Sequence, residues 1–216
     1  MRLRLAVVLL PFGIRTALNR RMTTIADSAA LILIDVQEGF DDSYWGPSSN
    51  PECEDNIAAL VDAWHEKGGT VVVVRHESAS PESPLHPDNP GSRLKPVAAN
   101  ATAELQVVKS VNSAFLGEPN LDEWLKARGS SQLVLCGIQT NMCVETTARM
   151  GGNLGYEVIV PLDATRTFDL AGAVGADGAQ ASATADELMR ITGINLSGGG
   201  FAKVTTTDAL LASMRV

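Results

Sequence analysis

Short aliphatic runs alternate with longer amphipathic segments from residue 31 onward, and this alternation constrains the fold more than any other feature. Residues 31–36 (LILIDV) form a largely β-branched run without polar alternation, which is typical of a strand buried on both faces. Residues 52–67 then place apolar side chains at helical spacing, and a glycine pair ends the segment. Residues 70–76 (TVVVVRH) repeat the buried-strand pattern. The chain therefore begins as a strand, a helix and a second strand.

The same alternation continues to the end of the chain. It predicts six strands separated by helical connections, which define one α/β domain: a doubly wound, mainly parallel six-stranded sheet with helices on both faces. A segment rich in Ser, Pro, Asn and Asp over 77–104 is predicted to be a long functional loop. The other strands are predicted over 104–110, 131–137, 157–162 and 201–207, and the other helices over 120–128, 140–155, 184–196 and 208–214.

The composition fits one globular domain and argues against several classes of partner. The 216 residues are 45% hydrophobic, enough to bury about two-thirds of the surface that the unfolded chain exposes. The formal net charge of −8 argues against a nucleic-acid partner, and no apolar run approaches the roughly 18 residues that span a bilayer. Three cysteines imply no disulfide framework, so we expect a cytoplasmic protein.

Residues 1–21 differ from the rest of the chain in charge. They contain five arginines and no acidic residue, since the first acid is Asp27. Three explanations are open: a signal peptide, a transit peptide, or upstream sequence ahead of a natural start at Met22. We expect residues 1–21 to be a dispensable extension and residues 22–216 to form the single domain.

Polar side chains with catalytic chemistry follow three of the predicted strands. Asp35 ends the first strand, Lys109 ends the third, and Cys143 follows the fourth near the start of a helix. Each has an ordinary interpretation when taken alone: a loop-capping acid, a solvated base and a small core residue. Open α/β sheets bind ligands at the carboxyl ends of their strands, so the three residues together predict a catalytic site.

The three groups also have coupled chemistry. A free thiol with a pKa of about 8.5 is only about 3% thiolate at pH 7, so a nucleophilic cysteine benefits from a lowered pKa. We expect the Lys109 ammonium and the first turn of a helix, capped by Thr140 or Asn141, to lower the pKa of Cys143. Asp35 would then take the thiol proton and deliver it to a leaving amine.

Three motifs resemble a known family. These are LILIDVQ (31–37), VVKSVNSAF (107–115) and the segment over 136–167, which begins CGIQTNMCVETTARMGG. Their order and spacing are similar to those of the isochorismatase-like cysteine hydrolases, which include nicotinamidases and N-carbamoylsarcosine amidases. The resemblance covers nearly all of residues 29–213 and is specific for the superfamily.

The resemblance implies a catalytic triad of Asp35, Lys109 and Cys143. It also implies a cis peptide between Ile138 and Gln139, which turns the backbone amides of Gln139 and Cys143 toward a developing oxyanion. The family forms dimers or higher assemblies, so the resemblance implies a homo-oligomer here as well.

The metal-binding histidines of nicotinamidases have no counterpart in this sequence. The stretch after Phe40 contains no histidine, and one histidine near the predicted site does not make a metal site. We therefore expect no metal and no cofactor. His76 ends the second strand and is a candidate substrate contact, while Phe40 and Trp45 are candidate walls of a substrate pocket.

The preferred interpretation is a cysteine hydrolase that cleaves a small-molecule C–N bond in an amide, carbamoyl or lactam substrate. The reaction would pass through a thioester-type acyl-enzyme on Cys143. Two alternatives stay open. One is an isochorismatase-type vinyl-ether hydrolase led by Asp35, and the other is a non-catalytic binding or redox-sensing protein of the same fold. The expected partner is a small molecule, with neither nucleic acid nor membrane.

Overall fold

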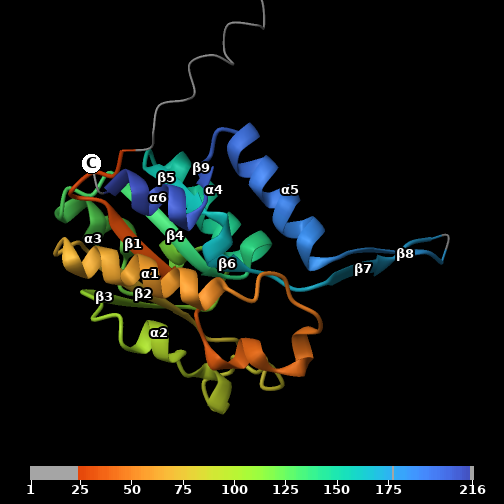
Figure 1. Ribbon diagram of the computed structural model, residues 1–216. Helices are drawn as coiled ribbons and strands as arrows, with labels where there is room; N and C mark the ends of the chain where they lie inside the picture. Colours follow the sequence, from red (N-terminus) through yellow and green to blue (C-terminus); the bar gives the residue numbers. More distant parts are fainter. Residues whose placement is uncertain (1–23, 177, 215–216) are drawn as a thin grey trace, which may run out of the picture.

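The computed structural model describes residues 24–176 and 178–214 (Figure 1). The extension predicted over 1–21 lies outside the described residues. The central sheet has the order β3-β2-β1-β4-β5-β9, and every neighbouring pair is parallel. These strands are β1 (Ala30–Ile34), β2 (Val71–His76), β3 (Leu105–Lys109), β4 (Gln132–Ile138), β5 (Glu157–Pro161) and β9 (Lys203–Thr205).

The two central strands, β1 and β4, are buried along their whole length. Ile32 of β1 pairs with Val72 on one side and with Leu135 on the other. A continuous aliphatic run suits such a strand, because each face of the sheet meets a layer of helices. The buried strand predicted from the first apolar run is therefore confirmed.

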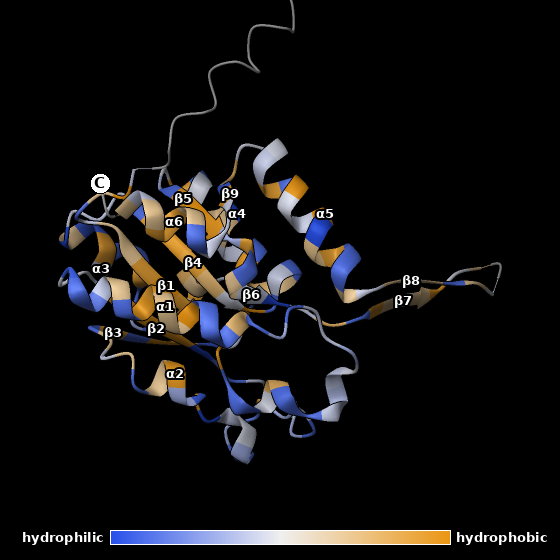
Figure 2. Ribbon diagram, in the orientation of Figure 1, coloured by the Kyte–Doolittle hydropathy of each residue, from blue (hydrophilic) through white to orange (hydrophobic). Residues whose placement is uncertain are grey.

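Helices cover both faces of the sheet, and each layer closes one apolar core. One core is completed by α3, α4 and α5, and the other by α1, α2 and α6. Figure 2 shows largely hydrophobic strands in the middle of the domain, with helices on either side in which hydrophobic and hydrophilic residues alternate. No helix in the described ranges is long and apolar enough to cross a membrane. The helices are α1 (Cys53–Glu66), α2 (Pro96–Ala99), α3 (Leu121–Ala127), α4 (Glu145–Asn153), α5 (Ala185–Gly198) and α6 (Thr207–Met214).

The strand order reverses between β1 and β4. The chain adds β2 and β3 on one side of β1, then crosses to place β4, β5 and β9 on the other side. This order confirms the doubly wound α/β prediction. It also places the carboxyl ends of β1 and β4 at the switch point, where sheets of this kind bind ligands.

Several elements go beyond the six predicted strands. A seventh strand, β6 (Thr165–Arg166), pairs with the end of β4. The strands β7 (Leu170–Val174) and β8 (Gln180–Ala183) form an antiparallel hairpin, which extends away from the rest of the domain in Figure 1. The described chain also contains the short helical turns η2 (Glu38–Asp41), η3 (Ser43–Trp45), η4 (Pro90–Ser92), η5 (Ala114–Leu116), η6 (Thr140–Val144) and η7 (Leu162–Ala164).

Candidate active site

The three residues predicted to form the site lie together at the carboxyl edge of the sheet. Asp35 directly follows β1, Lys109 is the last residue of β3, and Cys143 lies in η6 just after β4. Lys109 Nζ donates hydrogen bonds to Asp35 Oδ2 at 2.5 Å and to Cys143 Sγ at 3.3 Å. The side chains of Asp35 and Lys109 are fully buried. The fold therefore forms a contiguous acid, base and thiol from three separate strands.

Two backbone features shape this edge of the sheet. Asp35 has a positive φ of 52°, a left-handed conformation that aspartate tolerates better than most residues. Gly137 has a φ of 119°, and a Cβ atom there would lie 2.0 Å from the carbonyl oxygen of Ile34. Only glycine therefore allows the end of β4 to pass so close to β1. The next peptide bond, between Ile138 and Gln139, is cis.

His76 contacts the third side of the lysine ammonium. Its Nδ1 atom lies 3.3 Å from Lys109 Nζ, so this ring nitrogen is the acceptor and carries no proton. Burial and the neighbouring Lys109 charge lower the pKa of His76 to about 4. A neutral imidazole thus faces the ammonium at neutral pH. The residue also lines the pocket, where it was predicted as a substrate contact.

The thiol of Cys143 is not activated in the way that the sequence suggested. Burial and the charge of Asp35 together raise the pKa of Cys143 to about 12, because Lys109 only partly opposes them. The expected lowering is therefore wrong for the free protein. The main physical reason is that burial disfavours the charged thiolate. In addition, the Lys109 ammonium lies closer to Asp35 than to the sulfur atom, so it offsets the carboxylate more than it favours the thiolate.

The two carboxyl oxygen atoms of Asp35 differ in their hydrogen bonding. Burial raises the pKa of Asp35 despite the bond from Lys109 to Oδ2. Its other oxygen, Oδ1, is the one buried side-chain nitrogen or oxygen atom of the described residues that has no hydrogen-bond partner. Such an atom is costly in a folded protein and is usually explained by function. It is placed to accept a proton from the thiol.

The helix start around Cys143 also differs from the prediction. The residue that caps η6 is Gln139, and its side chain makes no capping bond. The hydroxyl of Thr140 donates to Thr165 Oγ1, and Asn141 Oδ1 accepts from the hydroxyl of Thr167. Neither side chain therefore caps the helix, because Thr140 bonds to Thr165 in β6 and Asn141 bonds to Thr167 just after it. Cys143 still lies in the first turn.

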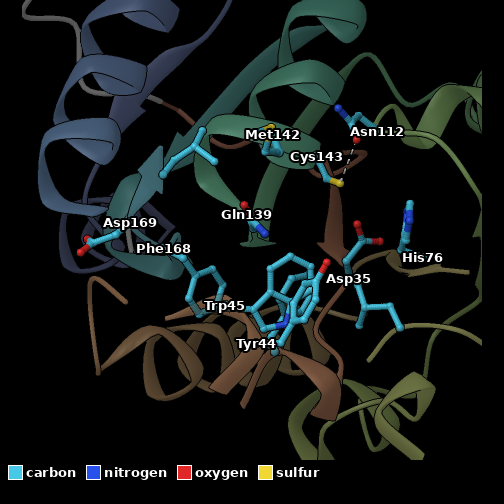
Figure 3. Close-up of a pocket in the computed structure, with 13 residues that line it drawn as sticks. Asp35, Tyr44, Trp45, His76, Asn112, Gln139, Met142, Cys143, Phe168 and Asp169 are labelled. Atoms are coloured by element: carbon cyan, nitrogen blue, oxygen red, sulfur yellow. Dashed lines mark hydrogen bonds between the residues drawn. The ribbon is translucent and has the colours of Figure 1, made fainter. Parts of the chain in front are cut away.

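A cavity of about 450 Å³ opens in front of the thiol. Figure 3 shows Cys143 and Asp35 on one side of it and aromatic rings on the other. The ring of Phe40 lies 5.0 Å from that of Trp45 and 5.9 Å from that of Phe168, measured between centroids. Phe40 and Trp45 both line this cavity, and their contact with a substrate stays a prediction.

Several lining residues were missed by the sequence analysis. The thiol of Cys143 lies 3.9 Å from Asn112 Oδ1, which is an acceptor for its proton. Asn112 belongs to the VNSAF stretch three residues after Lys109, so its position after a strand was a usable signal. Phe168 lies just after β6, a strand of two residues that is too short to give a recognisable sequence pattern. Tyr44 and Met142 also line the cavity.

The donor set at the site was tested for a metal ion. The ligand atoms of Asp35, His76 and Cys143 all lie within 4.8 Å of one another, which is close enough to share an ion. Lys109 Nζ, however, contacts all three of these residues. An ammonium group therefore already takes the place between them that a metal would need. The residues fit a metal poorly unless Lys109 moves away.

The fold and the site define an α/β enzyme with an acid, a base and a thiol at the sheet's switch point. The Isochorismatase domain matches residues 29–207, and the chain belongs to the isochorismatase family of hydrolases. The isochorismatase family protein YrdC of Bacillus subtilis (strain 168), itself uncharacterized, is 41% identical over 144 residues, covering 67% of this chain and 76% of that protein. A solved structure of an isochorismatase-family protein from Chromobacterium violaceum ATCC 12472 has a TM-score of 0.78 and 35% identity, covering 88% of this chain and 95% of the other.

A relative with a named substrate is more distant. Streptothricin hydrolase of Streptomyces noursei is 31% identical over 147 residues, which cover 67% of this chain and 51% of that enzyme. The match thus spans about half the length of this relative.

Proposed function

We propose that this protein is a cysteine hydrolase that cleaves a C–N bond in a small-molecule amide, carbamoyl or lactam substrate. The observation that carries the proposal is the position of Lys109 Nζ, which bonds both the Asp35 carboxylate and the Cys143 thiol beside the cavity. The likeness to streptothricin hydrolase supports hydrolysis of a small molecule. No cofactor takes part in the proposed reaction.

The first half of the reaction forms an acyl-enzyme. The Cys143 S–H bond breaks as its proton passes to Asp35 Oδ1, which leaves a thiolate. The electron pair of this thiolate then forms a bond to the substrate carbonyl carbon, while the C=O π pair moves to the oxygen atom and makes it an oxyanion. The proton stays within the site, so the charge of the Asp35, Lys109 and Cys143 group does not change. Before it attacks, the thiolate is stabilised by the Lys109 ammonium, whose Nζ atom lies 3.3 Å from the sulfur. A thiol that is protonated in the free enzyme is therefore compatible with nucleophilic attack.

The second half releases the amine and then the acid. As the C–N bond breaks, Asp35 returns its proton to the leaving nitrogen atom, and a thioester on Cys143 remains. Asp35 then accepts a proton from a water molecule that attacks the thioester carbon. The C–S bond breaks, the acid leaves, and the proton returns to the sulfur. The raised pKa of Asp35 suits a group that must hold and release a proton.

The oxyanion would be stabilised by backbone amides. We assign this role to the amides of Gln139 and Cys143, which flank the start of η6. Hydrogen-bond donors that are fixed in advance are worth about 10²–10³-fold in rate when they face the developing charge. His76 holds the lysine in place through its Nδ1 atom, and Asn112 accepts from the thiol in the resting state.

One observation favours a second candidate function. A buried carboxyl with a raised pKa is also suited to protonate a carbon–carbon double bond, as a vinyl-ether hydrolase requires. In that reaction Asp35 leads and the thiol is not essential. A redox-sensing role has less support, because Cys53 and Cys136 are fully buried and neither lines the cavity.

The deciding experiment is a substrate screen with trapping of the intermediate. The full chain is mixed with amides, carbamoyl compounds, lactams and vinyl ethers, and the release of ammonia, amine or carbonyl product is measured. A mass increase on the peptide that contains Cys143 during single turnover supports the acyl-enzyme. Turnover of a vinyl ether with no adduct on Cys143 would favour the second candidate. The same screen after exhaustive chelation tests the expectation that no metal is needed.

Further parts of the proposal concern the setting of the enzyme. We infer that it acts in the cytoplasm, because three free cysteines suit a reducing compartment. We also infer that it is a homo-oligomer, as the family resemblance implies. The surface that would join the copies is a separate question, and it depends on a different region of the molecule.

A further inference from the structure

The hairpin formed by β7 and β8, together with the turn between them, is here called the arm (residues 170–183). It leaves the domain beside the cavity and extends into solvent (Figure 1). All five residues of β7 are exposed, and so are the first three of β8. Within the part of the chain that the structure describes, β7 and β8 form a two-stranded sheet of their own. The arm therefore has almost no core.

A structure of this kind is not expected to persist alone in water. An isolated two-stranded hairpin is marginally stable at best, and a stable sheet needs a third strand or a packed layer. Natural proteins protect exposed strand edges with lysine, proline or charged side chains. The sequence of the arm contains none of these apart from Asp177. Its edges have the character of strands that are covered when the protein functions.

Apolar side chains continue from the arm onto the following helix. The described residues have eight exposed large hydrophobic side chains, and four of them lie between residues 170 and 194. Leu170 and Val174 on β7 are 44% and 63% exposed, and Ile191 and Ile194 on α5 are 43% and 56% exposed. Because α5 begins directly after β8, these exposed side chains lie on two consecutive elements, and together they are here called the apolar surface of this region.

We propose that this surface is a dimerisation element and that its partner is a second copy of this chain. The arm of each copy would pack against the arm and the outer face of α5 of the other. Two copies that each carry a charge of −8 repel one another, so they approach most easily where the surface is uncharged. The arm has one charged residue in fourteen. A two-fold axis also covers the strand edges of both copies at once.

The contact would also affect the cavity. Leu170 is both the first residue of the arm and part of the cavity wall, next to Asp169. Asp169 in turn accepts a hydrogen bond from the backbone N–H of Ala185, at the start of α5. Docking of a second copy on the arm and on α5 therefore fixes two sides of the cavity mouth. Assembly then lowers KM without adding a catalytic group.

The test compares two substitutions that differ only in place. Val174→Glu adds a charge on the arm, and Leu116→Glu adds the same charge elsewhere at a side chain that is equally exposed, at 63%. Sedimentation of the full chain is expected to show a dimer, or a multiple of two, for the wild type and for Leu116→Glu. Val174→Glu is expected to weaken dimerisation at least ten-fold. Mixing Val174→Glu with Val174→Lys is expected to restore a mixed dimer.

A second measurement covers the case in which the variant fails to fold. Hydrogen exchange of the wild-type chain is followed at a low and a high protein concentration. Arm amides are expected to exchange slowly only at the high concentration, while those of β1 and β4 do not change. A wild type that is monomeric at every concentration overturns the proposal. So do dimers of equal strength in all variants, or arm exchange that is independent of concentration. None of these readings depends on finding a substrate.

Discussion

The cavity at the carboxyl edge of the sheet and the arm adjoin one another in the chain, yet they are stabilised in opposite ways. Phe168, in the cavity wall, is 6% exposed, whereas Leu170, two residues later, is 44% exposed. At the sheet edge the fully buried Lys109 side chain contacts Asp35, His76 and Cys143. In the arm the strands are held by their own hydrogen bonds and little else. The first region is therefore fixed by the domain's own core, and the second needs a partner.

This difference shows where the chain can tolerate conformational strain. Asp35 has a left-handed backbone conformation, and its Oδ1 atom has no hydrogen-bond partner. Both unfavourable features are tolerated because the neighbouring strands β1 and β4 are fully buried and hold Asp35 in place. The arm has no such support, so it carries no strained non-glycine residue among the described positions. Substitutions in the two regions should consequently have very different effects.

The largest effect is expected for Cys143→Ala. Removal of the nucleophile should lower kcat on an amide substrate by more than about 10³-fold while the fold is retained. Cys53→Ala is the matched control, because Cys53 is also buried but does not line the cavity. The double variant with Asp35→Asn should be hardly slower than Cys143→Ala alone, since groups that act as a unit are not additive. Single-turnover kinetics that retain a tenth of the activity would rule out the thiol as nucleophile.

The second-largest effect is expected for the rate at which iodoacetamide alkylates the Cys143 thiol. With a pKa of about 12, Cys143 in the free protein has little thiolate at pH 7. The thiolate fraction is then about 10⁻⁵, against about 3% for a free cysteine, so alkylation should be roughly a thousand-fold slower than that of a small thiol. The rate should rise about ten-fold for each pH unit above 7. Labelling with iodoacetamide, followed by mass spectrometry, would contradict this if the rate levelled off near pH 8.

The ion pair at the site should dominate the stability of this edge of the sheet. Asp35→Asn and Lys109→Met each leave one buried charge without its partner, and each should lower the free energy of unfolding by about 3–5 kcal/mol. The double variant should be more stable than either single one. Lys126→Met is the control, since Lys126 is 61% exposed in its pair with Asp122 and should change stability by less than about 1 kcal/mol. Equal losses at both sites in urea unfolding would argue against a buried pair.

His76 should make the protein less stable in acid. Its pKa is about 4 in the folded protein and near its ordinary value of 6.5 in the unfolded chain. Between these values the unfolded chain binds more protons, so the free energy of unfolding decreases as the pH falls from 6.5 to 4. His76→Gln should make this dependence shallower. Urea unfolding at several pH values measures it, and an unchanged slope would mean that His76 is not held in its neutral form.

The strands of the core and the three site residues could be predicted from the sequence, whereas the arm could not. Runs such as 31–36 reveal their structure because their burial lies within the chain itself. The three site residues could be predicted because each directly follows or ends such a run. The arm could not, since residues 170–183 are mostly Ala, Gly and Ser and show no periodicity. The raised pKa of Cys143 could not be predicted either. It depends on the burial of the thiol and on the short distance between Lys109 and Asp35, which only the three-dimensional structure reveals.

The smallest effect on stability is expected for a leucine-to-alanine substitution in the arm. The same substitution in the core serves as the comparison. Leu135→Ala, in β4 and fully buried, should lower the free energy of unfolding by about 2–5 kcal/mol, because it leaves a cavity between the sheet and the helix layer of α3, α4 and α5. Leu170→Ala should change it by no more than about 0.5 kcal/mol at low protein concentration, where the arm is unpartnered. At high concentration the loss for Leu170→Ala should grow, because a dimer that binds only folded chains adds stability by mass action. Urea unfolding of both variants at two concentrations separates the cases. A loss at Leu170 that is large and independent of concentration would mean that the arm packs on its own domain.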